Sequence, residues 1–194
     1  MQSNLTPQAS RILDLTQTLI AAGGYNGFSY ADISEKIGIT KASVHHHFPK
    51  KSDLVRILVQ RYRAAAAEGL AAVSVKLKTP AARLDAYASW WSTCIRDGTM
   101  PICICAMLAA EMPALPADVG AEVRLHFVQL ADWLASVIAA GKADKSFRAR
   151  LDPAIEAETL MATVHGAMLS ARACDTKIFD RSVQAAFKRL TAPS

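Results

Sequence analysis

Residues 29–48, SYADISEKIGITKASVHHHF, decide the fold predicted for the amino-terminal third of the chain. Ser29 precedes an apolar helical pattern and is followed three residues later by Asp32, the spacing of a capping box. Gly38 ends that helix, because glycine readily adopts the left-handed conformation of a tight turn. Thr40 then caps a second helix. Two short helices joined by a glycine turn predict a helix-turn-helix over 29–48.

The two predicted helices separate into an apolar face and a basic face. The apolar side chains expected to form the small core are Ile33, Ile37, Ile39 and Val44. The second helix turns donors outward that can meet base edges or phosphates in a major groove: Lys41, Ser43, His45 and His46, with His47 near its end. An ordinary helical hairpin would explain the apolar spacing, but not the coincidence of a glycine turn, two caps and a basic face.

Composition excludes several classes of protein. The chain has 194 residues, of which 52% are hydrophobic and 20% charged, so it can bury a core and is not a disordered chain. Uncharged stretches such as 99–110 are shorter than the roughly 20 apolar residues of a membrane span. The amino terminus has no signal-peptide pattern, and 4 cysteines do not form a disulfide framework in a chain of this length. We expect a cytoplasmic protein with reduced thiols and no membrane partner.

Positive charge gathers around the predicted helix-turn-helix. Of 22 lysines and arginines and 17 acidic residues, 8 basic and 4 acidic side chains fall within residues 1–63. The rest of the chain is therefore close to balanced. A local basic excess favours a nucleic-acid partner, although a solvated basic face alone has the same composition.

The helix-capping and helix-ending residues in the rest of the chain predict an all-α fold of about nine helices. The alternation of apolar and polar residues typical of strands is missing, and apolar residues recur at three- and four-residue spacing. The expected helices are 7–22, 30–37, 41–47, 53–75, 80–98, 101–112, 116–141, 153–174 and 180–190. The long helix 53–75 connects a three-helix domain, 1–52, which carries the helix-turn-helix, to a second helical domain, 53–194.

Residues 13–62 resemble the amino-terminal domain of the TetR family of bacterial transcriptional regulators. The resemblance rests on a helix ending in Ala22-Gly23-Gly24, then Gly27-Phe28-Ser29, Gly38-Ile39-Thr40-Lys41, and the run from His46 to Leu54. It implies a homodimeric repressor that leaves a palindromic double-stranded operator when a small molecule binds the second domain. The DNA contacts that we predict are Ser29, Tyr30, Lys41, Ala42, Ser43, His45, His46, His47 and Lys51. His45 departs from the family pattern, which has an aromatic residue there.

The second domain carries candidates for a dimer seam and an effector pocket. Small residues over 166–171, with Val183, Phe187 and Leu190, suit a two-fold four-helix seam. Bulky or polar residues expected to point inward are pocket candidates, and each is also compatible with ordinary core packing: Trp90, Trp91, Cys94, Cys103, Met107, His126, Phe127, Leu130, Met161, His165 and Met168. This lining predicts a largely apolar effector.

Residues 100–111 resemble a stretch in one branch of the TetR family, with Cys103 at the matching place. This resemblance implies a second hypothesis, a regulator that senses electrophiles or oxidants through a thiol. We expect Cys103 just inside a helix that starts at Pro101, where a helix amino terminus favours a thiolate. An inert buried thiol and, with Cys105, a soft-metal site remain alternatives. A remote alternative is an enzyme with Cys103 or Cys105 as nucleophile and a histidine base, but no catalytic motif supports it. We therefore predict no enzymatic activity and no cofactor. We also predict no metal site at His45, His46 and His47, because consecutive side chains on a helix point in different directions and cannot converge on one ion.

Overall fold

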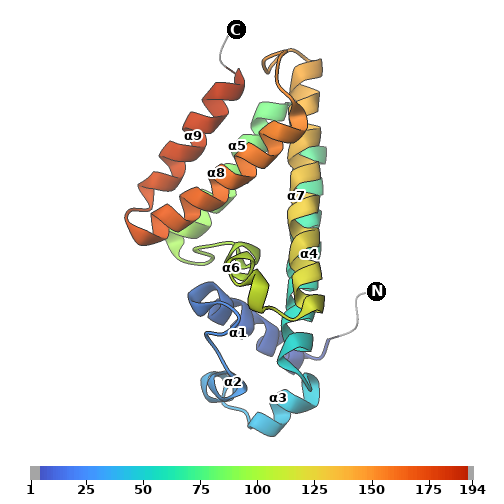
Figure 1. Ribbon diagram of the computed structural model, residues 1–194, viewed down its shortest axis with the longest axis vertical. Coiled ribbons are helices and arrows are strands. Elements are labelled where there is room, and N and C mark those ends of the chain that lie inside the picture. The colour runs from blue at the N-terminus through green and yellow to red at the C-terminus, as the bar shows by residue number, and fades with distance from the viewer. Residues whose placement is uncertain (1–4, 192–194) are drawn as a thin grey trace. The chain divides into compact units, whose positions relative to one another are not determined.

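A computed structural model describes residues 5–191, and within that range the chain forms nine α-helices, one short 3₁₀ helix and no strand, which confirms the all-α prediction (Figure 1). The helices are α1 (Pro7–Gly23), α2 (Tyr30–Ile37), α3 (Lys41–His47), α4 (Lys51–Lys76), α5 (Pro80–Asp97), α6 (Ile104–Ala110), η1 (Met112–Ala114), α7 (Ala117–Ala143), α8 (Pro153–Ala173) and α9 (Lys177–Thr191).

The chain divides into two compact units. Unit 1 contains residues up to Arg63 together with Ile104–Leu125, and unit 2 contains Ala64–Cys103 together with the residues from His126 onward. Both α4 and α7 contribute residues to each unit. The core of unit 1 is formed by α1 to α4 with α6 and the start of α7, and that of unit 2 by α5, α8, α9 and the rest of α7.

Local capping explains most of the helix starts. Thr6 and Thr79 accept hydrogen bonds from the backbone N–H groups of Ala9 and Ala82, and a proline follows each of them in the first helical turn. Asp152 caps α8 by accepting from two backbone N–H groups. These starts agree with the sequence prediction because an N-cap and its partner lie within three residues of one another.

Two predicted helix starts are wrong. The helix expected at Pro101 begins at Ile104, so Cys103 precedes α6. The four residues from Ile102 to Cys105 are all fully buried, and a chain passing through a core need not follow the amphipathic pattern of a surface helix. α9 begins at Lys177 rather than Asp180, because the carboxylate of Asp175 accepts a hydrogen bond from the Lys177 backbone N–H at 3.0 Å.

The length of uncharged runs predicted no segment capable of spanning a membrane, and α7 differs from that prediction. By length and composition alone it is long and apolar enough to cross a membrane, and a third of its most apolar stretch is buried. Buried core helices of soluble proteins satisfy the same criterion. Uncharged runs alone do not single out this helix, because isolated charged residues interrupt its apolar sequence.

Candidate nucleic-acid interface and effector site

The turn between α2 and α3 has the predicted geometry. Ser29 and Asp32 form a complete capping box, and hydrogen bonds from Ser29 lower the pKa of the Asp32 carboxyl. Gly38 has φ +68°, in the left-handed region. Thr40 accepts a hydrogen bond from the Ser43 backbone N–H at 3.1 Å. Both helix starts and the turn are therefore fixed by local interactions.

The small core of this motif is narrower than predicted. Ile33 and Val44 are fully buried, as expected, whereas Ile37 and Ile39 are only half-buried. Phe48 completes the core at the end of α3 and is almost fully buried. The two helices consequently pack through one central pair and one aromatic ring.

The outer face of α3 lies open to solvent. Lys41, Ala42, His45 and His46 are exposed, and Ser43 and His47 are half-buried. The His46 and His47 rings meet edge to face, with centroids 5.5 Å apart. Ser29 is exposed at the start of α2. These positions fit the predicted contacts with DNA, which stay a prediction.

The Tyr30 side chain, which the sequence suggested as a phosphate contact, is turned into the protein. Its side chain is 7% exposed and its hydroxyl donates to the Phe48 carbonyl at 2.7 Å. Burial, with a smaller contribution from the nearby Asp53 carboxylate, raises the pKa of Tyr30 to about 12. The His45 ring meets the Tyr30 ring edge to face at 4.6 Å. Tyr30 thus ties α2 to the end of α3 and supports His45.

Lys51 also has partners within the protein. Its ammonium group donates to the Phe28 carbonyl and lies 4.1 Å and 4.8 Å from the ring centroids of Phe28 and Tyr25. Partial burial lowers its pKa, while the carboxylates of Glu111 and Asp32 act in the opposite direction. Lys51 therefore holds the loop before α2 against the start of α4, whatever its contact with phosphate.

Glu111 is a residue of unit 1 that sequence reasoning missed. Its carboxylate accepts hydrogen bonds from the backbone N–H groups of Tyr25 at 2.5 Å and Asn26 at 3.3 Å. Gly24 permits this approach, since a Cβ at that position would lie 2.3 Å from the Glu111 carboxylate. The residue after α6 thus holds the turn between α1 and α2.

The start of α7 is joined to α4 by polar side chains. Gln60 donates to Glu122 at 2.6 Å, and Arg63 pairs with the same carboxylate at 3.0 Å. Arg56 lies 3.6 Å from Asp118. Three polar contacts therefore tie the start of α7 to α4 within unit 1.

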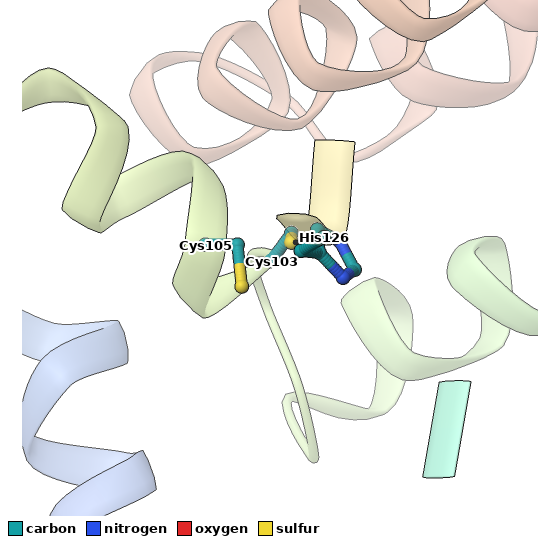
Figure 2. A group of neighbouring side chains, drawn as sticks. All are labelled: Cys103, Cys105 and His126. Atoms are coloured by element: carbon teal, nitrogen blue, oxygen red, sulfur yellow. Dashed lines mark hydrogen bonds between the residues drawn. The ribbon is translucent and has the colours of Figure 1, made fainter. Parts of the chain in front are cut away.

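Within unit 2, Cys103 and His126 are both buried and lie side by side (Figure 2). The Cys103 Sγ is 3.7 Å from His126 Nε2. Cys105, drawn with them, lies two residues further along the chain in α6. Thiolate and imidazole are ligands of Zn²⁺ and Cu⁺. The same pair also allows proton transfer from the thiol to the imidazole.

A row of rings continues from this pair into α8. The His126 and Phe127 rings meet edge to face at 5.8 Å, and those of Phe127 and His165 at 5.2 Å. His165 is 9% exposed, and its Nε2 has no hydrogen-bond partner among the described residues. Sequence reasoning selected all three residues, but gave no reason why His165 should adjoin the consecutive residues His126 and Phe127.

Tyr87 is a second residue that sequence reasoning missed. It is buried, and burial together with the neighbouring Cys103 raises the pKa of its hydroxyl. Its ring lies 5.8 Å from that of Trp133, whose indole N–H donates to Ser74 at 2.9 Å. Nothing in the sequence around Tyr87, three residues before Trp90, indicated that it would lie near Cys103.

The other pocket candidates divide by burial. Trp91, Leu130 and Met168 are buried, and Cys94 and Met161 are half-buried, all in unit 2. The expectation that Trp90 points inward is wrong, because it is 50% exposed. Consecutive helical side chains project about 100° apart, so Trp90 and Trp91 cannot share a face. Met107 lies in unit 1.

Comparisons with known proteins agree along the whole chain. Residues 12–58 match the family described as bacterial regulatory proteins, tetR family, and residues 80–187 match the tetracyclin repressor-like C-terminal domain. A TetR-family transcriptional regulator from Agrobacterium tumefaciens is 48% identical, with TM-score 0.93 over 96% of this chain and 100% of that one. A search of curated proteins gave no match.

Two more distant structures share the fold. A TetR transcriptional regulator from Legionella pneumophila is 23% identical, with TM-score 0.84 over 97% of this chain and 100% of that one. The reduced form of E. coli NemR is 18% identical, with TM-score 0.81 over 96% and 98% of the two chains. The chain therefore belongs to the TetR family of bacterial regulatory proteins and is a DNA-binding transcriptional regulator with a carboxy-terminal ligand-binding domain.

Proposed function

We propose that this regulator is a cytoplasmic homodimeric repressor that leaves a palindromic operator when a small molecule binds its carboxy-terminal domain. The observation that carries the DNA-binding part is the exposed outer face of α3, with Lys41, His45 and His46, on a helix whose start is capped by Thr40. We place the DNA-binding domain at residues 1–52 and the effector domain at 53–194. The proposal assigns no enzymatic reaction to the chain.

Dimerisation is supported by an unpaired face of α8. Ile155 and Leu169 are 60% and 53% exposed, and small residues, Ala162 and Gly166, lie exposed between them. Val183 and Leu190, which the sequence suggested for the seam, are instead buried within the protomer. A second copy that covers the α8 face would place two reading helices on one DNA face, with half-sites about one helical turn apart.

An electrophoretic mobility shift on the DNA upstream of the gene tests the proposal. We expect a specific complex whose affinity falls steeply with salt, because lysine and arginine side chains that neutralise phosphates release the counterions bound to DNA. Lys41→Ala should weaken that complex, and Lys76→Ala, which changes an exposed lysine at the end of α4, serves as the matched control. A complex unaffected by both changes would place the DNA contact elsewhere.

A covalent signal is the second candidate, and the contact between Cys103 and His126 favours it. A thiol that passes its proton to an adjacent imidazole becomes a nucleophile towards electrophiles. Full burial of Cys103 and its position before α6 weigh against rapid reaction. Cys103→Ser should abolish release of DNA by electrophiles while DNA binding persists, and unchanged release would exclude this candidate.

A further inference from the structure

We infer that the effector is an uncharged, largely apolar molecule with a hydroxyl group, and that this hydroxyl pairs with Nε2 of His165. The inference rests on the proposed function in one respect, that unit 2 binds the effector. It goes beyond that function by naming the anchoring atom and the chemical class of ligand.

The first observation is the unpaired imidazole nitrogen. His165 is nine-tenths buried in α8, and its Nε2 has no hydrogen-bond partner among residues 5–191. A buried polar atom without a partner destabilises the protein, whereas a ligand group that completes the hydrogen bond removes that penalty. The atom is therefore the natural anchor for a polar group that arrives from outside.

The second observation is the character of the surroundings. Phe127 meets the His165 ring at 5.2 Å, and Met161 and Met168 flank His165 one helical turn away on either side. Methionine side chains are flexible and re-pack readily around apolar surface. Phe127 and Met161 are only half-buried, so this neighbourhood extends to the surface of unit 2.

The third observation is the absence of a buried charge. Among the described residues no lysine, arginine, aspartate or glutamate is buried. A charged ligand beside His165 would therefore find no buried lysine, arginine, aspartate or glutamate as a fixed counter-charge, and burying an unpaired charge is strongly unfavourable. A hydroxyl group avoids this cost and pairs with either neutral tautomer of imidazole, because it both donates and accepts.

Three probes with one hydrocarbon frame test the ligand class on the full-length protein: 2-naphthol, naphthalene and 2-naphthoate, with dissociation constants from equilibrium dialysis at pH 8. We expect 2-naphthol to bind at least about tenfold more tightly than either of the others. Equal binding of naphthol and naphthalene, tighter binding of naphthoate, or no binding of any probe would overturn the inference.

Two variants test the anchoring atom. His165→Leu should abolish the preference for naphthol, so that naphthol and naphthalene bind with about equal dissociation constants. It should also raise the melting temperature of the unliganded protein, because it removes an unpaired buried polar atom. His165→Gln should keep part of the preference. Gln129→Leu, an exposed change on α7, should alter neither quantity. A lower melting temperature for His165→Leu, or a retained preference, would overturn the assignment of Nε2.

DNA binding measured in parallel distinguishes failure of the His165 site from failure of the proposed repressor function. If DNA binding is intact but naphthol selectivity is absent, this inference fails and the DNA-binding part of the proposed function stands. If naphthol binds through His165 without releasing DNA, the site is confirmed and the effector-release part of the proposed function fails.

Discussion

The carboxylate of Glu111 accepts a hydrogen bond from the backbone N–H of Tyr25, 86 residues earlier in the chain, at 2.5 Å. The same carboxylate accepts from the backbone of Asn26. Glu111 directly follows α6, whereas Tyr25 lies in the turn that orients α2. One side chain thus joins the segment Ile104–Leu125 to the turn that precedes the helix-turn-helix.

We predict that Glu111→Ala lowers the free energy of unfolding by about 1–3 kcal/mol, because it leaves backbone donors without a charged acceptor. It should also weaken DNA binding, since the turn before α2 loses its support. Urea denaturation and a DNA titration measure the two effects. Glu68→Ala, which changes an exposed glutamate of α4, is the control. If the two variants were equally stable, the bond to Tyr25 would contribute nothing in solution.

The glycine turn of the helix-turn-helix provides a second prediction. Gly38→Ala should destabilise the protein by about 1 kcal/mol, because φ +68° is strained for any residue with a Cβ. Gly69→Ala, within α4 and with open space around the new methyl group, should stabilise it by about 0.5–1 kcal/mol. Thermal unfolding of both variants checks the signs. The same sign for both would contradict the left-handed turn.

Tyr30 predicts a specific response to alkaline pH. Its pKa is about 12 in the folded protein and 10.0 without burial, so between these values the folded state holds a proton that the unfolded state has lost. Stability contributed by Tyr30 is therefore complete below pH 10 and is lost as pH rises towards 12.

Tyr30→Phe isolates this contribution, because the other tyrosines titrate in both proteins. At pH 8 the variant should be less stable by about 1 kcal/mol, having lost the bond to the Phe48 carbonyl. Chemical denaturation at a series of pH values should show the difference shrinking above pH 10. A constant difference up to the onset of alkaline unfolding would mean that the Tyr30 hydroxyl is not buried as described.

Lys51→Met separates a structural role from a phosphate contact. The substitution keeps the apolar stem but removes the bond to the Phe28 carbonyl and the contacts with two rings, so we expect about 1–2 kcal/mol of destabilisation. The salt dependence of DNA binding should also become shallower if the ammonium group reaches a phosphate. Lys50→Met, an exposed neighbour, is the matched control for stability. Unchanged stability in both variants would reduce Lys51 to a surface charge.

The features predicted correctly are those encoded within a few residues. The capping box of Ser29, the left-handed Gly38 and the cap at Thr40 each depend on partners at most four positions away. The exposed face of α3 follows from the helical repeat once these boundaries are set. For the same reason the all-α class and most helix limits could be predicted from the sequence.

The features that sequence reasoning missed depend on tertiary partners. Nothing near Tyr30 or Lys51 indicates that their polar groups bond to carbonyls of Phe48 and Phe28. The bond from Tyr25 to Glu111 joins positions too distant for any local pattern. In unit 2 the histidines were chosen as polar residues on apolar helices, but only packing brings Phe127 between His126 and His165.

Selection of binding sites from a pool of random DNA duplexes tests the central claim most directly, because it requires no knowledge of the operator. We predict enrichment of a two-fold symmetric sequence with half-sites about one helical turn apart, bound more weakly as salt increases. A variant with Lys41→Ala and His46→Ala should lose that enrichment while keeping its melting temperature. Failure to enrich any sequence, or the same enriched sequence from the variant, would contradict the placement of α3 on the bases.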